Sequence, residues 1–261
     1  NMEISEVTDW LESEYPASFA EEWDNVGLLV GDDQREVSKV FLALDLTEDT
    51  LDQAVSFGAD LVITHHPMIF SGLKKINNHS FTGRRILKLL EHHMAYYAMH
   101  TNYDILGMAD LSADYLGLQK RQVLTETAQR NGQPEGLGRV GELERPMSLG
   151  AFARSVKESL RLMDVRVYGD ADRQIQKVAV CTGSGKSLMS DVLASGADVY
   201  VTGDVDHHTG IDAVADGLAV IDAGHYGTEY IFVEAMREKL GRKFEQLKIQ
   251  GARVRFPYQN F

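Results

Sequence analysis

Histidines and carboxylates stand directly after three apolar segments of this chain. His65 and His66 follow the first segment, Asp104 follows the second, and His225 and Glu229 follow the third. Imidazole and carboxylate groups are common protein ligands of divalent metals, and in α/β sheets such groups gather at the carboxyl ends of strands. The sequence therefore predicts a metal site, provided that these three places meet in space.

The neighbouring histidines favour a pair of ions over a single one. Adjacent residues of a regular strand point to opposite faces, so His65 and His66 cannot easily bind one ion together. At a strand end each histidine can serve a different ion, and a carboxylate such as Asp104 or Glu229 can bridge the two. Two cations about 3.5–4 Å apart form the usual hydrolytic clamp. Mixed ligands of this kind suit zinc, iron, manganese or nickel alike.

Each of the three groups also has an explanation that needs no metal. A histidine pair at a strand end is commonly a hydrogen-bonded turn. Glu229 can interact favourably with a helix dipole, and Asp104 can cap a helix that begins after Gly107. The coincidence of all three groups at strand ends favours the metal.

A repeated pattern divides the chain into two related halves. Three apolar segments recur in the same order, and the first two keep the same spacing: 39–44 with 177–182, 58–64 with 196–202, and 94–98 with 218–222. Gly-Ala-Asp opens the second segment of each copy. Such self-similarity indicates an internal duplication.

Helical patterns separate these strands in both halves. The segment 47–57 begins with a capping-box-like Thr47-Glu48-Asp49-Thr50, and 187–195 is its partner. The segments 84–93 and 209–216 occupy the next equivalent place. Strands that alternate with helices predict an α/β fold of two similar domains, each with a sheet covered by helices.

The expected domains are residues 1–126, residues 127–229, and a closing helix and strand over 230–261. Residues 131–141 are rich in glycine and polar side chains and are the linker candidate. The closing segment is a candidate to pack on the first domain.

Other side chains have weaker signals. His207 and His208 lie near the repeat position of the first histidine pair, and they are candidates for proton transfer because imidazole titrates near neutral pH. His100 either orients a ligand or lies apart from the site. Trp23 either covers the site or fills the core.

A glycine-rich turn over 182–187 resembles a phosphate loop but is not a Walker A motif. That motif requires glycine at position 180, where this chain has Val180. The backbone amides of the turn remain candidates for binding an anion.

Composition limits the class of protein. The net charge of −13 and the lack of a dense basic run speak against a broad nucleic-acid surface. The single cysteine, Cys181, excludes an intrachain disulfide and fits a reducing, cytoplasmic environment. No apolar run is long enough to predict a membrane span.

Together the motifs of this chain resemble the GTP cyclohydrolase I type 2 homologue family, also called the NGG-interacting factor 3-like proteins. The resemblance covers essentially the whole chain. The motifs that carry it are Glu22-Trp23-Asp24-Asn25-Val26-Gly27-Leu28, Ile63-Thr64-His65-His66-Pro67 with Phe70, His100-Thr101-Asn102-Tyr103-Asp104, Thr202-Gly203-Asp204 with His207-His208, and Gly224-His225-Tyr226-Gly227-Thr228-Glu229.

The resemblance implies a dinuclear metal centre between the two halves, with His65, His66, Asp104, His225 and Glu229 as ligands. It implies a homo-oligomer, namely a ring-shaped hexamer, and hydrolytic opening of the guanine ring of GTP. Two cations would activate a water for attack on a nucleotide or a related small molecule. The alternative is a metal-binding, metal-delivery or scaffold protein without enzymatic activity.

Overall fold

A computed structural model describes residues 1–261 as two compact units. Unit 1 comprises residues 1–103 and 232–255, and unit 2 comprises residues 104–231 and 256–261. The division thus falls between Tyr103 and Asp104 and not near residue 126. Most of the closing segment belongs to unit 1, because its strand pairs with a strand of that unit.

Unit 1 is built on a five-stranded sheet with the strand order β1-β4-β3-β2-β11. The strands are β1 (Gly27–Val30), β2 (Lys39–Ala43), β3 (Leu61–Thr64), β4 (Ala95–Ala98) and β11 (Lys248–Gly251). Only the pairing of β1 with β4 is antiparallel. Every residue of β3 and β4 is buried, as expected for parallel strands covered on both faces.

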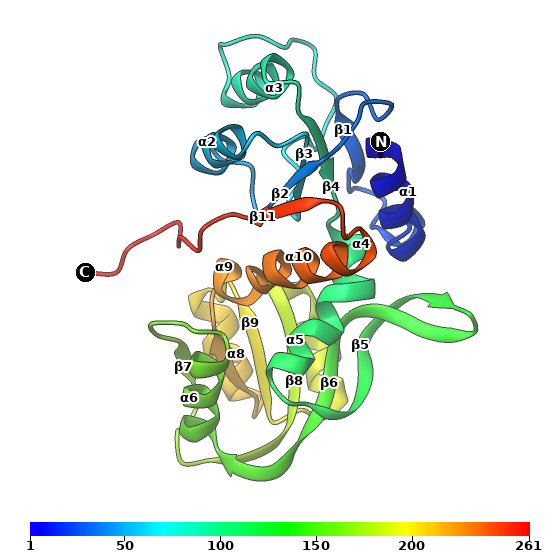
Figure 1. The fold of residues 1–261 in the computed structure, drawn as a ribbon. Helices are drawn as coiled ribbons and strands as arrows, with labels where there is room; N and C mark the ends of the chain where they lie inside the picture. Colours follow the sequence, from blue (N-terminus) through cyan, green and yellow to red (C-terminus); the bar gives the residue numbers. More distant parts are fainter. The chain divides into compact units, whose positions relative to one another are not determined.

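Helices cover both faces of this sheet. They are α1 (Ile4–Glu14), α2 (Glu48–Phe57), α3 (Phe81–Glu91), the short α4 (Thr101–Tyr103) and α10 (Ile231–Lys243), with a 3-10 turn at Ala17–Phe19. α2 and α3 lie on one face and α1 lies on the other (Figure 1). Trp10 of α1 packs edge-on against Phe244, just beyond α10, with ring centroids 5.6 Å apart.

Unit 2 is built on a six-stranded mixed sheet with the strand order β5-β6-β8-β9-β10-β7. The strands are β5 (Gln119–Arg130), β6 (Gln133–Ser148), β7 (Arg166–Tyr168), β8 (Gln174–Ser184), β9 (Val199–Gly203) and β10 (Ala219–Asp222). β8, β9 and β10 are parallel, and the other pairings are antiparallel. The predicted α/β fold is confirmed, with antiparallel strands added at both edges of this sheet.

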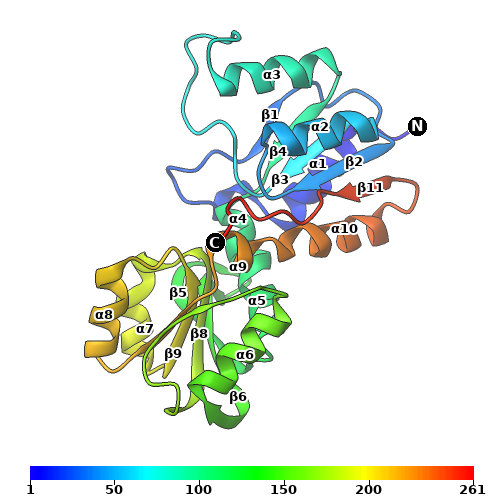
Figure 2. The same ribbon diagram turned by 90° about the vertical axis from the view of Figure 1, so that its left-hand side faces the viewer.

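The helices of unit 2 also cover two faces. They are α5 (Ala109–Tyr115), α6 (Leu149–Ser159), α7 (Met189–Ser195), α8 (His207–Ala215) and α9 (His225–Glu229), with a π-helical turn at Asp104–Met108 and a 3-10 turn at Lys186–Leu188. α7 and α8 lie on one face of the sheet, and α5 and α6 lie on the other (Figure 2). No helix in either unit combines the length and the apolar character that a membrane span requires.

Capping side chains explain where the helices begin. Thr47 and Thr50 form the predicted capping box of α2. α3 begins at Phe81, earlier than the sequence pattern indicates, because the hydroxyl of Ser80 accepts a hydrogen bond from the Gly83 backbone N–H. Asp206 caps α8 in the same way, and this cap brings His207 and His208 into the helix.

The linker expected over residues 131–141 is a β-hairpin instead. β5 and β6 pair up to Arg130 and Gln133, and the two residues between them are Asn131 and Gly132. Both have positive φ angles, 53° and 76°. Asn-Gly is the preferred pair for this tight hairpin turn, so its polar composition reflects turn geometry and not a flexible connection.

An aspartate holds the repeated strands in the same way in each unit. The Asp60 carboxylate accepts hydrogen bonds from the backbone N–H groups of Ser38 and Lys39, at 2.8 and 3.0 Å. The Asp198 carboxylate accepts two bonds from Gln176 and Lys177, both at 2.9 Å. The Gly-Ala-Asp pattern therefore has one structural role in both copies: it joins the start of one strand to the start of its neighbour.

Replacement of either aspartate with alanine is expected to destabilise the protein. Asp60→Ala and Asp198→Ala each leave two backbone N–H groups without a charged acceptor, and hydrogen bonds to charged groups contribute about 1.5–3 kcal/mol each. Water can replace part of this loss because both side chains are partly exposed, so we expect a fall of about 1–3 kcal/mol in the free energy of unfolding. Urea unfolding followed by circular dichroism measures it. An equal loss in Asp212→Ala, an exposed aspartate of α8, would contradict this role.

Candidate metal centre

Three histidines of unit 1 meet at one edge of its sheet. His65 and His66 follow β3, and His100 follows β4, the parallel neighbour of β3. One ring nitrogen from each histidine lies within 4.8 Å of the other two. His65 is fully buried, and the side chain of His66 is 18% exposed. Parallel strands bring their carboxyl ends to the same edge, and this explains why two distant segments supply one cluster.

Hydrogen bonds fix the tautomers of the first two rings. Nδ1 of His65 lies 2.9 Å from the carbonyl oxygen of Met99, and Nδ1 of His66 lies 2.8 Å from a carboxylate oxygen of Asp45. Both oxygens are acceptors, so each Nδ1 carries the proton and donates it. In a neutral ring Nε2 is then the nitrogen that carries a lone pair, which is the arrangement of metal-binding histidines.

His100 has the same arrangement. Its Nδ1 lies 3.1 Å from a carboxylate oxygen of Asp24, which also accepts hydrogen bonds from the backbone N–H and the hydroxyl of Thr101. Burial alone would raise the pKa of Asp24, but the hydrogen bonds from His100 and Thr101 outweigh it and lower the pKa to about 2. Asp24 is therefore ionised near neutral pH. The sequence did not place His100 firmly in the site, although its position after a strand was a usable signal.

Trp23 and Phe70 stand over His100. Trp23 meets the His100 ring edge-on with centroids 5.8 Å apart, and Phe70 does so at 6.3 Å. Both aromatic side chains are more than half exposed, at 62% and 53%. Trp23 therefore covers a histidine of the cluster and does not fill the core.

In unit 2 a single helical turn carries a histidine and a carboxylate. Nε2 of His225 lies 3.2 Å from a carboxylate oxygen of Glu229, four residues further along α9. Nδ1 of His225 lies 2.7 Å from a carboxylate oxygen of Asp204, so this ring has the same tautomer as the histidines of unit 1. Glu229 is only 3% exposed. The His225 side chain is 38% exposed, and either a proton or a cation between its Nε2 and the Glu229 oxygen would satisfy both atoms.

Asp104 lies at the start of the π-helical turn of unit 2. Its charge, like that of Glu229, affects the pKa of the Cys181 thiol. Burial raises the pKa of Cys181 to about 12, and the nearby charges of Asp104 and Glu229 contribute to this rise. Cys181 also packs against the apolar cluster of unit 2, and its thiol remains protonated near neutral pH because of the raised pKa.

Gly183 leaves open the space in front of His225 and Glu229. Its φ is +73°, and a Cβ at this position would lie 2.2 Å from Glu229 Oε1 and 3.3 Å from His225 Nε2. Only glycine fits there, both because of the backbone conformation and because any side chain would fill the space before the two ligand atoms.

The glycine-rich turn does not offer the free amides that an anion site needs. The backbone N–H of Gly183 donates to the Thr228 hydroxyl at 2.8 Å, and that of Gly185 donates to the Thr202 hydroxyl at 3.0 Å. The expectation that these amides hold an anion is wrong because two threonines already accept their hydrogen bonds.

His207 and His208 occupy the first turn of α8. Both are exposed, and their ring centroids lie 5.0 Å apart. Neither belongs to a group of side chains close enough to share a metal. Their role in proton transfer stays a prediction.

Comparisons with known proteins agree over nearly the whole chain. Residues 2–256 match the sequence profile of the family described as Duf34/NIF3 (NGG1p interacting factor 3). A Clostridium acetobutylicum protein named GTP cyclohydrolase 1 type 2 homolog is 36% identical over 242 residues, 92% of this chain and 90% of that protein. A Streptomyces coelicolor protein of the same name is 38% identical over 237 residues, 88% and 83% of the two chains.

Solved structures show the same fold. The crystal structure of a Bacillus cereus protein related to NIF3 is similar with a TM-score of 0.91 at 28% identity, and the alignment covers 100% of this chain and 99% of that one. Reduced HcgD from Methanocaldococcus jannaschii is similar with a TM-score of 0.81 at 31% identity, over 96% and 97% of the two chains. Because the family profile spans residues 2–256, this chain belongs to the Duf34/NIF3 family.

Proposed function

We propose that this protein is a hydrolase that depends on two divalent metal ions, with His65, His66, Asp104, His225 and Glu229 as the ligands. One observation supports this proposal above all. Each histidine of the candidate centre, including His100, turns Nδ1 to an oxygen acceptor, so that Nε2 is the ring nitrogen in position to bind a metal. Metal-binding histidines almost always donate the other ring N–H to such an oxygen acceptor, which fixes the orientation of the ring.

The donor set suits a divalent cation. It combines neutral imidazoles with carboxylates, and zinc, iron, manganese and nickel all accept such ligands. The buried Glu229 carboxylate would be costly to maintain without a positive charge beside it, and a cation at His225 Nε2 would provide that charge. Gly183 keeps the place free of any side chain.

The residues of this chain have distinct tasks in the proposed reaction. Bound cations would supply a Lewis acid and lower the pKa of a nearby water. Met99, Asp45 and Asp204 hold the imidazole rings in one orientation. His207 and His208 are the proposed proton carriers, since both are exposed and imidazole is the side chain most often used for general acid–base catalysis.

The proposed substrate is a nucleotide or a related small molecule. The relatives named GTP cyclohydrolase 1 type 2 homolog make GTP the first compound to test. Elemental analysis of the purified protein is expected to find close to two ions per chain. A hydrolysis screen of GTP and other nucleotides, with the matched metal restored, is then expected to show turnover. Stoichiometric metal without turnover across the screen would favour a metal-delivery protein.

Asp204→Asn is expected to weaken metal binding without unfolding the protein. An asparagine carries no negative charge, so its hydrogen bond with His225 Nδ1–H is weaker than that of Asp204. Loss of such a partner typically lowers metal affinity 10–100-fold. Competition with a chromophoric chelator measures the affinity. Asp212→Asn, at an exposed position of α8, is the matched control and is expected to bind as the unaltered protein does.

We also propose, from its family membership, that the chain forms a cytoplasmic homohexamer. Analytical ultracentrifugation is expected to give six times the mass of the chain. A monomer at micromolar concentration would contradict the hexamer and would leave the metal proposal untouched.

A further inference from the structure

The segment between Asp60 and Glu91 has a charge that is unusual for this chain. It contains five lysines and arginines and no carboxylate, although the chain as a whole carries a net charge of −13. Three large apolar side chains of this segment, those of Leu73, Ile76 and Phe81, are 43–57% exposed. Exposed apolar side chains that occur together with charged ones mark a surface for a partner.

These side chains form one surface because the loop over residues 72–80 packs against the first turn of α3. The carbonyl oxygen of Asn77 lies so close to Gly83 that a Cβ there would be 1.9 Å from it. Ile76 directly precedes this contact in the chain, and Phe81 begins the helix. α3 lies at the outside of unit 1 (Figure 1).

The positive charges of this surface are mostly unpaired. Arg85 and Lys88 form ion pairs within unit 1, both with carboxylates of α2. Lys74, Lys75 and Arg84 are exposed and form no ion pair within the chain. We call the surface of residues 73–76, 81 and 84 the basic face.

An acidic counterpart occurs later in the chain, over residues 187–236. That stretch contains nine carboxylates and no lysine or arginine. It includes α8, whose inner side packs on unit 2 through the buried Gly210 and Ala213. α8 lies at the outside of unit 2, so its outer side is available to a partner (Figure 2).

Apolar and acidic side chains share the outer side of α8. Ile211 and Val214, three residues apart, are 45% and 43% exposed. Asp212 and Asp216 are exposed and form no ion pair within the chain. We call these four residues the acidic face. Like the basic face it combines exposed apolar groups with unpaired charges, but its charge has the opposite sign.

We propose that the basic face of one copy of this chain docks on the acidic face of a second copy. Apolar groups from both copies are buried in the contact, and the opposite charges select this pairing over others. Two different surfaces meet, so the contact repeats head to tail and forms a ring when the rotation closes. The inference rests on the proposed homohexamer and names the surfaces that build it.

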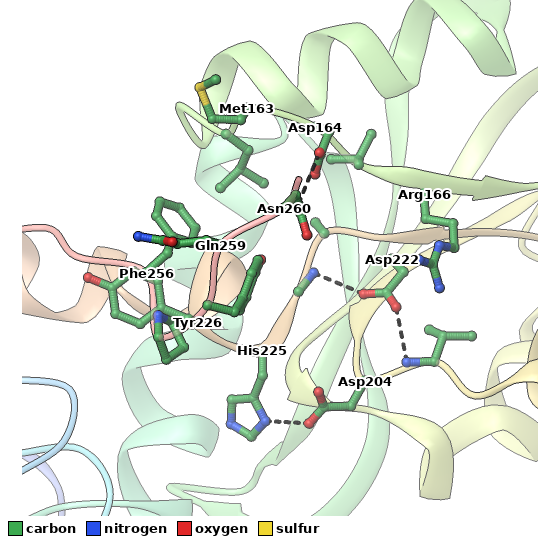
Figure 3. Close-up of a pocket in the computed structure, with 17 residues that line it drawn as sticks. Met163, Asp164, Arg166, Asp204, Asp222, His225, Tyr226, Phe256, Gln259 and Asn260 are labelled. Atoms are coloured by element: carbon green, nitrogen blue, oxygen red, sulfur yellow. Dashed lines mark hydrogen bonds and ion pairs between the residues drawn. The ribbon is translucent and has the colours of Figure 1, made fainter.

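The acidic face lies next to a candidate metal ligand. Asp204, three residues before α8 begins, accepts the hydrogen bond of His225 Nδ1 at 2.7 Å (Figure 3). His207 and His208 form the first turn of the same helix. The proposed contact thus brings a second copy to the helix that carries both proposed proton carriers.

Charge reversal tests the two faces. Exposed ion pairs contribute little one at a time, so each variant reverses two charges. Lys74→Glu with Lys75→Glu, and Asp212→Lys with Asp216→Lys, each place like charges in the contact. Each double variant is expected to weaken self-association at least about tenfold, measured by analytical ultracentrifugation over a range of concentrations.

A fourfold variant separates an interface from a structural effect. It combines both double variants, so that the charges in the contact are again opposite, and it is expected to recover the mass of the unaltered assembly. Arg145→Glu with Arg154→Glu, at exposed positions outside both faces, is the matched control because it changes the net charge as much as the lysine reversals do. Circular dichroism checks that each variant is folded.

The inference is overturned if both double variants assemble as the unaltered protein does, or if the fourfold variant does not recover the assembly. Binding to anionic vesicles or to nucleic acid through Lys74 and Lys75, without self-association, would identify another occupant and would also overturn it. Failure of the metal proposal would look different, as low metal content or absent turnover in a protein that still assembles.

Discussion

Glu229→Ala is expected to lose metal while it keeps its fold. The carboxylate is 3% exposed and lies 3.2 Å from His225 Nε2. Loss of a hydrogen-bond partner of a ligand alone costs 10–100-fold in affinity, so loss of the ligand itself is expected to cost more than about 100-fold. Elemental analysis after dialysis against a chelator, together with the nucleotide screen, measures metal content and turnover.

The stability of the metal-free protein shows whether Glu229 is a metal ligand or a structural residue. In the metal-free protein the buried Glu229 carboxylate carries a desolvation cost, and its removal offsets the packing lost with the side chain because the partner His225 is 38% exposed and is not left as a buried charge. Thermal unfolding in EDTA is therefore expected to show no loss for Glu229→Ala. Glu158→Ala, at an exposed position of α6, is the control for both measurements. If Glu229→Ala kept two ions per chain, the ligand assignment would be wrong.

Gly203→Ala is expected to have the largest effect on stability. A Cβ at this position would lie 2.5 Å from the carbonyl oxygen of Gly183 and 2.5 Å from the carbonyl carbon of Gly224. Both neighbours are backbone, so the strand ends must separate. Overpacking of this kind typically costs 1–3 kcal/mol and occasionally more, and we expect at least about 3 kcal/mol here.

The same substitution is also expected to weaken metal binding, because Gly183 and Gly224 hold the backbone around His225. Urea unfolding and chelator competition measure the two effects. Gly241→Ala is the matched control: it lies in α10 with no atom within 4 Å of the new methyl group. It is expected to be neutral or to stabilise by about 0.5–1 kcal/mol, since alanine is a better helix former. A stable Gly203→Ala would contradict the close contact between the strand ends.

The sequence was most informative where a local rule determines the structure. Thr47 and Thr50 predicted the start of α2, and the Gly-Ala-Asp repeat marked Asp60 and Asp198, which bind equivalent backbone groups. The histidine pair after β3 was recognisable because a buried parallel strand leaves polar residues only at its end.

The sequence was less informative where distant segments meet. The partners of the imidazole rings, such as Asp24 for His100, come from segments with no periodic relation to them. The amides of Gly183 and Gly185 looked free because nothing local indicates that Thr228 and Thr202 reach them. The cavity wall formed by residues 256–260 was also hidden, because that segment has no regular structure.

The pairing of β11 with β2 has a consequence for folding during synthesis. Chains usually begin to fold from the N-terminus as they leave the ribosome, but the sheet of unit 1 lacks one edge strand until residues 248–251 have been made. Most of unit 2, residues 104–231, has been made before then, and only its residues 256–261 follow. The nascent chain therefore carries an open strand edge at β2 until β11 has been made, and an open edge of this kind can pair with another strand.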